Sequence, residues 1–183
     1  MSEKKKQIIE AAIQMMRDGG YNTFSFRDIA DEVGVKSSSV HHHFRRKENL
    51  AIAAVEKYKE RFFEALGPSF DPETTAKAKF QRYASVFISA FEASGRTCLC
   101  GILSNESPML PEAVTKEVSR FVDENLDWLA DAYLSGSSEI RSEESKSFAL
   151  VTYSSLEGAM ATATLKKDVK WLRLVCDQIE ETL

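Results

Sequence analysis

Residues 20–44 read GYNTFSFRDIADEVGVKSSSVHHHF, and this stretch decides the fold. Ser25 is followed three residues later by Asp28, which is the spacing of a capping box at the start of a short helix. Gly34 ends that helix, and a second short helix is predicted over about 37–43. Two short helices joined by a glycine-containing turn form a helix-turn-helix.

The flanking sequence predicts helices on both sides of this motif. On the amino-terminal side, apolar residues recur on one helical face until Gly19 and Gly20 end the pattern; they are Ile9, Ala12, Ile13 and Met16. On the carboxyl-terminal side, a helix is expected over 47–66. Within the motif, Val40 and Phe44 are expected to face inward and to hold the second short helix against the others.

Glycine and proline near residue 67 indicate a domain boundary. The remaining chain predicts helices over about 73–93, 100–107, 111–134, 139–165 and 168–182, with no convincing strand. We therefore predict an all-α protein with two domains. Residues 1–66 form a three-helix helix-turn-helix domain with a following helix, and residues 67–183 form a second helical domain.

Charge is distributed unevenly along the 183 residues. The net charge is −4, but the first 50 residues carry nine basic and seven acidic side chains while the remainder carries fifteen and twenty-one. The apolar runs are too short to span a membrane, and the amino terminus has no secretory h-region. These features predict a cytoplasmic protein without a membrane partner, whose three cysteines remain thiols.

The motif resembles the amino-terminal domain of the tetracycline-repressor (TetR) family of transcriptional regulators. The resemblance covers about residues 4–64 and combines the elements GY, RDIA, GV, HHF and KENL at matching spacing. It implies a DNA-binding head followed by a helical domain for ligand binding and dimerisation. Two departures are His41, where the family often has Tyr, and Arg45-Arg46, where it often has Pro and a small polar residue.

The resemblance also implies which side chains face DNA. The short second helix enters the major groove, where base edges distinguish all four base pairs. Three serines at its start favour phosphate, because free N–H groups point out of the first turn. The predicted DNA-binding residues are Arg27, Lys36, Ser37, Ser38, Ser39, His41, His42 and Lys47.

No residue set in the sequence indicates enzyme chemistry or a cofactor. We find no Ser-His-acid set, no glycine-rich phosphate loop and no two-metal carboxylate cluster, so catalytic residues, metal and cofactor are all predicted to be none. Adjacent histidines on a helix point about 100° apart, so the run at 41–43 does not converge on one ion. A small helical enzyme or redox protein and a helical adaptor remain the alternative classes.

The second domain carries aromatic residues at helical spacing. Most of them are expected to pack in the core, but some could line an apolar ligand cavity. The candidate ligand-binding residues are Tyr83, Phe87, Phe91, Cys98, Cys100, Trp128 and Tyr153. Cys98 and Cys100 could instead sense thiol-reactive compounds or simply pack as small apolar residues.

The last two helices are expected to form a homodimer interface. The apolar residues that motivate this prediction are Phe148, Val151, Leu156, Leu165, Leu172, Val175 and Ile179. The complete expectation is a ligand-responsive regulator, most simply a repressor. It would bind a palindromic operator in double-stranded DNA as a homodimer and be released by an unknown small-molecule effector.

Overall fold

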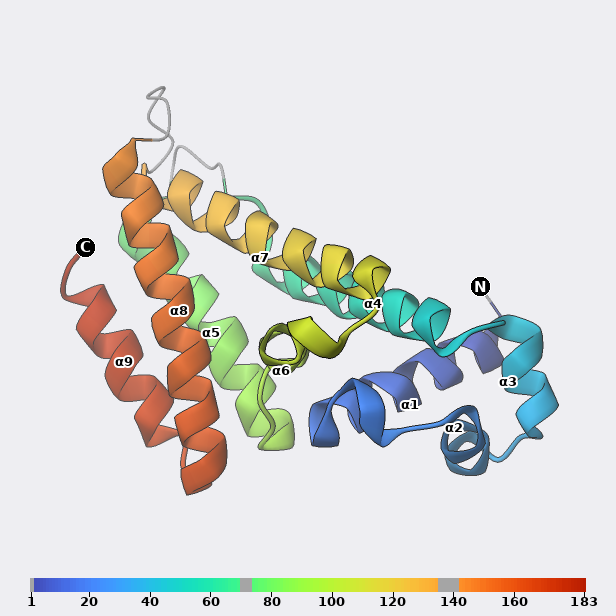
Figure 1. The fold of residues 1–183 in the computed structure, drawn as a ribbon. Helices are drawn as coiled ribbons and strands as arrows, with labels where there is room; N and C mark the ends of the chain where they lie inside the picture. Colours follow the sequence, from blue (N-terminus) through green and yellow to red (C-terminus); the bar gives the residue numbers. More distant parts are fainter. Residues whose placement is uncertain (1, 70–73, 135–141) are drawn as a thin grey trace. The chain divides into compact units, whose positions relative to one another are not determined.

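The computed structural model describes residues 2–69, 74–134 and 142–183, and within these ranges every regular element is a helix and there is no strand. This confirms the predicted all-α class. The elements are α1 (Glu3–Gly19), η1 (Tyr21–Thr23), α2 (Phe26–Val33), α3 (Ser37–His43), α4 (Lys47–Leu66), α5 (Ala76–Ser94), α6 (Leu99–Asn105), η2 (Ser107–Met109), α7 (Glu112–Tyr133), α8 (Glu143–Lys166) and α9 (Lys170–Glu180) (Figure 1).

The predicted helices agree with these elements apart from their ends. The helix expected from residue 73 begins at Ala76, because the Thr75 hydroxyl accepts the N–H of Ala78 and caps it. The helix expected from 139 is described from Glu143 onward, with Ser142 as its cap. Residues 73 and 139–141 lie outside the described residues. The two single turns η1 and η2 were not predicted.

The chain divides into two compact units. The first contains residues 1–61 and 99–121, and the second contains residues 62–98 and 122–183. The division therefore falls inside α4 and inside α7, and it differs from the sequence-based boundary at residue 66. The reason is that α6 packs against α1 and joins the amino-terminal unit, a long-range contact that no local breaker signals.

The first unit is built around α1. This helix buries Ile8, Ile9, Ala12, Ile13 and Met16 along the face that the sequence predicted. It packs against α2, which in turn packs against α3. Figure 1 shows the three helices gathered at the blue end of the chain, with α3 following α2 after a short turn.

Local chemistry fixes both ends of α2. The Ser25 hydroxyl accepts the Asp28 N–H at 3.3 Å, and the Asp28 carboxylate accepts the Ser25 N–H at 2.7 Å, so the predicted capping box is confirmed. At the other end Gly34 takes a left-handed conformation with φ of 68° and its N–H closes the last turn. This turn sets the direction in which the chain enters α3.

The second unit joins α5, α8 and α9 with the carboxyl-terminal part of α7. Helix α5 contacts α8 and α9, and α8 lies along α9 (Figure 1). An aromatic cluster fills its interior: the Tyr83 ring lies 5.4 Å from that of Phe87, 5.5 Å from that of Trp128 and 5.9 Å from that of Phe62, between ring centres. Burial of such rings supplies much of the apolar driving force of a small domain.

Removal of the capping hydroxyl by Ser25→Ala is expected to lower the free energy of unfolding by about 1 kcal/mol. The Asp28 pKa is held below its usual value mainly by the hydrogen bond from Ser25. Protonation of Asp28 therefore breaks the box, and the difference between variant and wild type should shrink as the pH falls through the lowered pKa. Denaturant unfolding at several pH values measures this.

The control is Ser2→Ala, which removes the same type of bond from the first turn of α1. That turn is at the chain end and can fray, so a smaller loss is expected. Equal losses in the two variants would contradict the importance given to the Ser25 cap.

Candidate nucleic-acid interface

Helix α3 presents one apolar and one polar face. Val40 and Phe44 are buried against the rest of the first unit, as predicted. Ser38, His41 and His42 are exposed, whereas the side chains of the flanking Ser37 and Ser39 are half-buried; this follows from the helical period, which turns these positions toward different sides. The exposed face is therefore polar, short and rich in hydrogen-bonding groups.

Two of the predicted DNA-binding residues are exposed cations outside α3. Lys36 precedes the first turn of α3, where its carbonyl accepts the Ser39 N–H at 2.8 Å, and its side chain is exposed. Arg27 lies on α2, where its guanidinium is 3.9 Å from the Asp31 carboxylate in a solvent-exposed pair. Such pairs contribute little to stability, so the arginine can exchange this partner for another anion at little cost.

Lys47 lies in a different environment from the other predicted residues. It is half-buried, and its ammonium stands over two aromatic rings, 4.3 Å from the centre of Phe24 and 4.7 Å from that of Tyr21. Burial lowers the pKa of Lys47, and the nearby carboxylates of Asp28 and Glu106 act in the opposite direction. This cation therefore also has an internal role in the first unit.

The histidine run does not form a shared cluster. The His41 ring meets the edge of Phe26, with 4.7 Å between ring centres, whereas the His42 ring lies 5.4 Å from that of His43. In the described parts of the chain, no three His, Cys, Asp or Glu side chains are gathered to hold a metal ion. The T-shaped contact with Phe26 favours one orientation of the His41 ring at the exposed face.

The predicted ligand-binding residues are all buried, but they do not share one unit. Tyr83, Phe87, Phe91, Cys98, Trp128 and Tyr153 belong to the second unit, whereas Cys100 belongs to the first. Within the second unit, Tyr83 is the centre of the aromatic cluster. Its hydroxyl donates to the Asn125 side-chain oxygen at 2.6 Å, and the Trp128 indole N–H donates to the Gly67 carbonyl at 2.9 Å.

Sequence reasoning missed Glu157, a carboxyl group inside the second unit. Both carboxyl oxygens are buried without a regular hydrogen bond, and burial raises the pKa of Glu157 well above its usual value. The neighbouring Cys98 thiol acts in the same direction, while the Tyr153 hydroxyl acts against it. In the sequence, Glu157 follows Tyr153 by four residues, and this spacing predicts that both side chains lie on one face of the helix.

The three cysteines are thiols and not disulfides, and all of them are buried. Burial raises the pKa of Cys176 to about 11, which agrees with the predicted packing role of this residue on the last helix. Cys98 and Cys100 are 2% and 0% exposed. Neither of them is presented at the surface, where a thiol reagent would have direct access.

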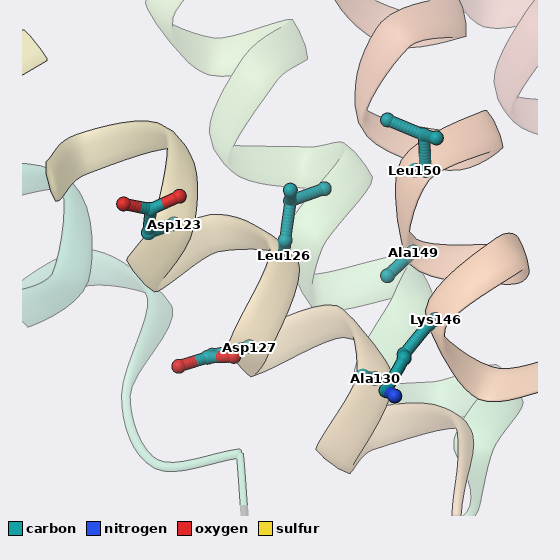
Figure 2. A pocket seen from close by; sticks show the side chains of 7 residues that line it. All are labelled: Asp123, Leu126, Asp127, Ala130, Lys146, Ala149 and Leu150. Carbon is teal, nitrogen blue, oxygen red and sulfur yellow. The ribbon is translucent and has the colours of Figure 1, made fainter. Parts of the chain in front are cut away.

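The described residues of the second unit line at least two surface grooves. One follows the seam between α7 and α8, with Asp123, Leu126, Asp127 and Ala130 on α7 and Lys146, Ala149 and Leu150 on α8 (Figure 2). The other lies between α8 and α9 and is lined by Ser147, Phe148, Val151, Thr152, Ser155, Leu174, Val175, Gln178, Ile179 and Thr182. None of the seven predicted ligand-binding residues lines either groove.

Membrane-spanning potential is low for individual helices. In residues 2–69, 74–134 and 142–183, no single helix has the length and apolar character needed to cross a bilayer, although α5 and α6 would meet these criteria if taken together as a bent pair.

The arrangement of α1, α2 and α3 defines the class of the protein: it is an all-α helix-turn-helix protein with a second helical unit. The family profile of bacterial regulatory proteins, tetR family, matches residues 8–54, which span this motif. The predicted resemblance of the amino-terminal domain to the tetR family is therefore confirmed over residues 8–54. The relatives and the solved structures that match it are transcriptional regulators.

Similar proteins agree with this placement. A TetR transcriptional regulator from Legionella pneumophila has 27% sequence identity and a TM-score of 0.89, with 100% of this chain and 98% of the other covered. The HTH-type transcriptional repressor KstR2 of Mycolicibacterium smegmatis is 27% identical over 50% of this chain and 43% of its own length. The fatty acid metabolism regulator protein of Bacillus subtilis is 29% identical over 42% and 39%, respectively. The chain thus matches less than half the length of these two curated relatives.

Proposed function

We propose that the protein is a DNA-binding transcriptional regulator that reads its operator with α3. The observation that carries this proposal is the polar exposed face of α3, held by Val40 and Phe44 in a helix-turn-helix. Small serines let the backbone of the helix approach DNA closely, and histidine can hydrogen-bond to base edges. The name of the KstR2 relative favours a repressor, and regulation of genes implies a cytoplasmic location.

Selection from a pool of random-sequence DNA duplexes tests the proposal, because this experiment does not require the operator sequence. We expect enrichment of a palindromic sequence, because two copies related by a two-fold axis present identical helices to two half-sites. Affinity for the enriched duplex should fall steeply with salt, since bound protein releases counterions from phosphate. Equal affinity for enriched and random duplexes would reject a sequence-reading role.

Two substitutions separate contact with phosphate from contact with bases. Lys36→Ala is expected to weaken binding to all duplexes and to reduce the slope of log affinity against log salt by about one. His42→Ala is expected to cost about 1–3 kcal/mol on the selected operator and to relax the preference at one base position. Fluorescence anisotropy titrations at several salt concentrations measure both effects.

The matched control is Lys116→Ala, which removes an exposed lysine that pairs with Glu112 on α7. It should leave affinity and salt slope at the wild-type values. If Lys36→Ala and His42→Ala behave like this control, the assignment of these residues to the interface is wrong.

We further propose a homodimer formed through α8 and α9. Exposed apolar side chains support this: Leu150, Val151, Leu165 and Leu174 are 56–80% exposed, and Val151 and Leu174 line the groove between α8 and α9. Exposed apolar patches of this kind mark interaction surfaces. The row expected from the sequence needs one correction, because Leu156 and Leu172 are buried inside their own unit.

The dimer proposal predicts that Leu174→Glu yields monomers. A charge at the centre of a buried interface is costly to desolvate, and an obligate interface of more than about 2,000 Å² loses its complementarity around it. Sedimentation velocity at micromolar concentration measures the change. Met109→Glu, at another exposed apolar side chain in the first unit, should remain dimeric. A monomeric wild type would overturn this proposal.

The effector proposed for this regulator is a small, largely apolar or aromatic molecule that releases the protein from DNA. The aromatic cluster around Tyr83 supports this chemistry, and the name of the fatty acid metabolism regulator relative is in keeping with it. The candidate contact residues in the second unit are Tyr83, Phe87, Phe91, Cys98, Trp128 and Tyr153, whereas Cys100 belongs to the first unit and leaves this set. If the effector weakens DNA binding, DNA must weaken effector binding by the same factor.

Burial of Cys98 and Cys100 favours a noncovalent effector over a covalent one. We expect brief treatment with iodoacetamide to leave operator affinity unchanged in the native protein, because a buried thiol reacts slowly. Mass spectrometry of the treated protein and an anisotropy titration measure alkylation and affinity together. Release from DNA by the reagent in the wild type, but not in Cys98→Ser or Cys100→Ser, would establish the covalent trigger instead.

A further inference from the structure

Basic side chains of the first unit differ in whether a carboxylate neutralises them. Several are paired with a carboxylate at 2.5–3.9 Å; they are Lys6, Arg27, Lys57, Lys59, Arg61, Lys116 and Arg120. Within the described residues, Lys36, Arg45 and Arg46 have no such pair, and all three are exposed. Lys36 precedes α3 and the two arginines follow it, so unpaired positive charge lies at both ends of the proposed DNA-reading helix.

The start of α1 adds another cation at the carboxyl-terminal end of α3. The Lys5 ammonium stands over the ring of Phe44, 5.4 Å from its centre, and no carboxylate pairs with it in the described part of the chain. Phe44 ends α3, since its N–H donates to the Val40 carbonyl at 2.8 Å, and it directly precedes Arg45. The contact with this ring therefore holds Lys5 near the two arginines. We refer to Lys5, Arg45 and Arg46 as the basic rim.

Lys47 follows the two arginines in sequence but is engaged inside the first unit. Its ammonium stands over the rings of Tyr21 and Phe24. The Glu106 carboxylate attracts this ammonium, and its Oε2 atom accepts the Tyr21 N–H at 2.8 Å. Gly20, with φ of 85°, leaves room for this carboxylate, because a Cβ atom there would overlap Oε1 of Glu106. The exposed cations after α3 are therefore the arginines, and Lys47 is not grouped with them.

Arginine at position 46 is unfavourable for the helix that follows it. The Arg46 carbonyl accepts the N–H groups of Asn49 at 3.1 Å and Leu50 at 3.4 Å, so Arg46 is the N-cap residue of α4. A small polar side chain would accept an N–H of the first turn, whereas arginine carries only donors. Its positive charge also lies at the positive end of the helix dipole. The stability of α4 therefore does not explain a cation here, whereas an anionic partner does.

With α3 in the major groove of DNA, phosphates lie near both of its ends. The seven residues of α3 rise by about 10 Å, which is slightly less than the groove width of roughly 12 Å. Cations at the ends of so short a helix are therefore close to the phosphates that border the groove. Such contacts fix the register of the helix on the duplex without reading bases. Arginine suits this task, because its planar fork of donors can hold a phosphate through two hydrogen bonds.

We propose that the basic rim of Lys5, Arg45 and Arg46 binds DNA phosphates at the carboxyl-terminal end of α3. The rim supplies affinity for duplex DNA of any sequence and aligns the polar face of α3, while Lys36 acts at the opposite end of the helix. The inference rests on the proposed function, because it assigns a further contact with the same DNA. It extends the interface to α1 and to the link before α4, outside the set of residues predicted from the sequence.

Arg46→Ser separates a role in DNA binding from a role in folding. In anisotropy titrations, the variant should lose affinity for the selected operator and for random duplexes by the same factor. Its slope of log affinity against log salt should be smaller by about one. The advantage of the wild type should therefore shrink about three- to fourfold between about 50 and 200 mM salt. Denaturant unfolding should show a higher midpoint for the variant, because serine can cap α4.

Lys5→Ala and Arg45→Ala test the rest of the basic rim. Each should reduce the salt slope by about one, and a variant with all three substitutions should reduce it by nearly three, because contacts with separate phosphates add. The matched control is Arg61→Ser, which removes an arginine that pairs with Glu10 near the other end of α4. It should keep the wild-type slope. Circular dichroism verifies folding, and if the triple variant does not fold, Arg46→Ser decides.

The outcomes distinguish the basic rim from the proposed function. If the rim variants keep wild-type affinity and salt slope while His42→Ala relaxes the base preference, the rim is wrong and the proposed function stands. A changed base preference with an unchanged salt slope would likewise overturn phosphate binding by the rim. Reduced binding to phosphatidylglycerol vesicles with unchanged duplex affinity would assign the rim to a lipid surface instead. A wild type that binds no duplex would reject both proposals.

Discussion

The packing of Val40 and Phe44 is the interaction on which the first unit depends. A helix of seven residues such as α3 is not stable in water by itself, because nucleation costs more than so few hydrogen bonds return. It persists because these two side chains are buried while its remaining face is polar. The side chains available for recognition are therefore those that remain exposed once Val40 and Phe44 are packed. Their positions depend on the packing of this core.

Most of the first unit could be predicted because its signals are local. The apolar spacing of α1, the capping box of Ser25 and Asp28, and the glycine at the end of α2 each act within a few residues. The DNA-facing positions on α3 were implied by the family resemblance, and of these Ser37 and Ser39 are half-buried. Lys47 could not be placed in this way, since its aromatic partners Tyr21 and Phe24 are more than twenty residues away in sequence.

In the second unit, important contacts join residues that are distant in sequence, so local signals do not predict them. Its helices were predictable from apolar spacing, but its polar interior was not. Glu157 and Lys79 are charged residue types with buried polar atoms, and nothing in their flanking sequence distinguishes them from exposed residues. Buried ionisable groups are expensive, so they usually have a structural or functional reason. The Tyr83–Asn125 hydrogen bond likewise joins α5 to α7 across 42 residues.

The close approach of Glu106 to Gly20 also constrains how the sequence can change over time. A side chain at position 20 needs both a different backbone conformation and a shorter residue at position 106, whereas a shorter residue at 106 leaves Gly20 undisturbed. The constraint between positions 20 and 106 therefore acts in one direction: residue 106 can shorten first, and only then can position 20 gain a side chain. Where glycine at 20 is replaced, a residue smaller than glutamate should stand at 106.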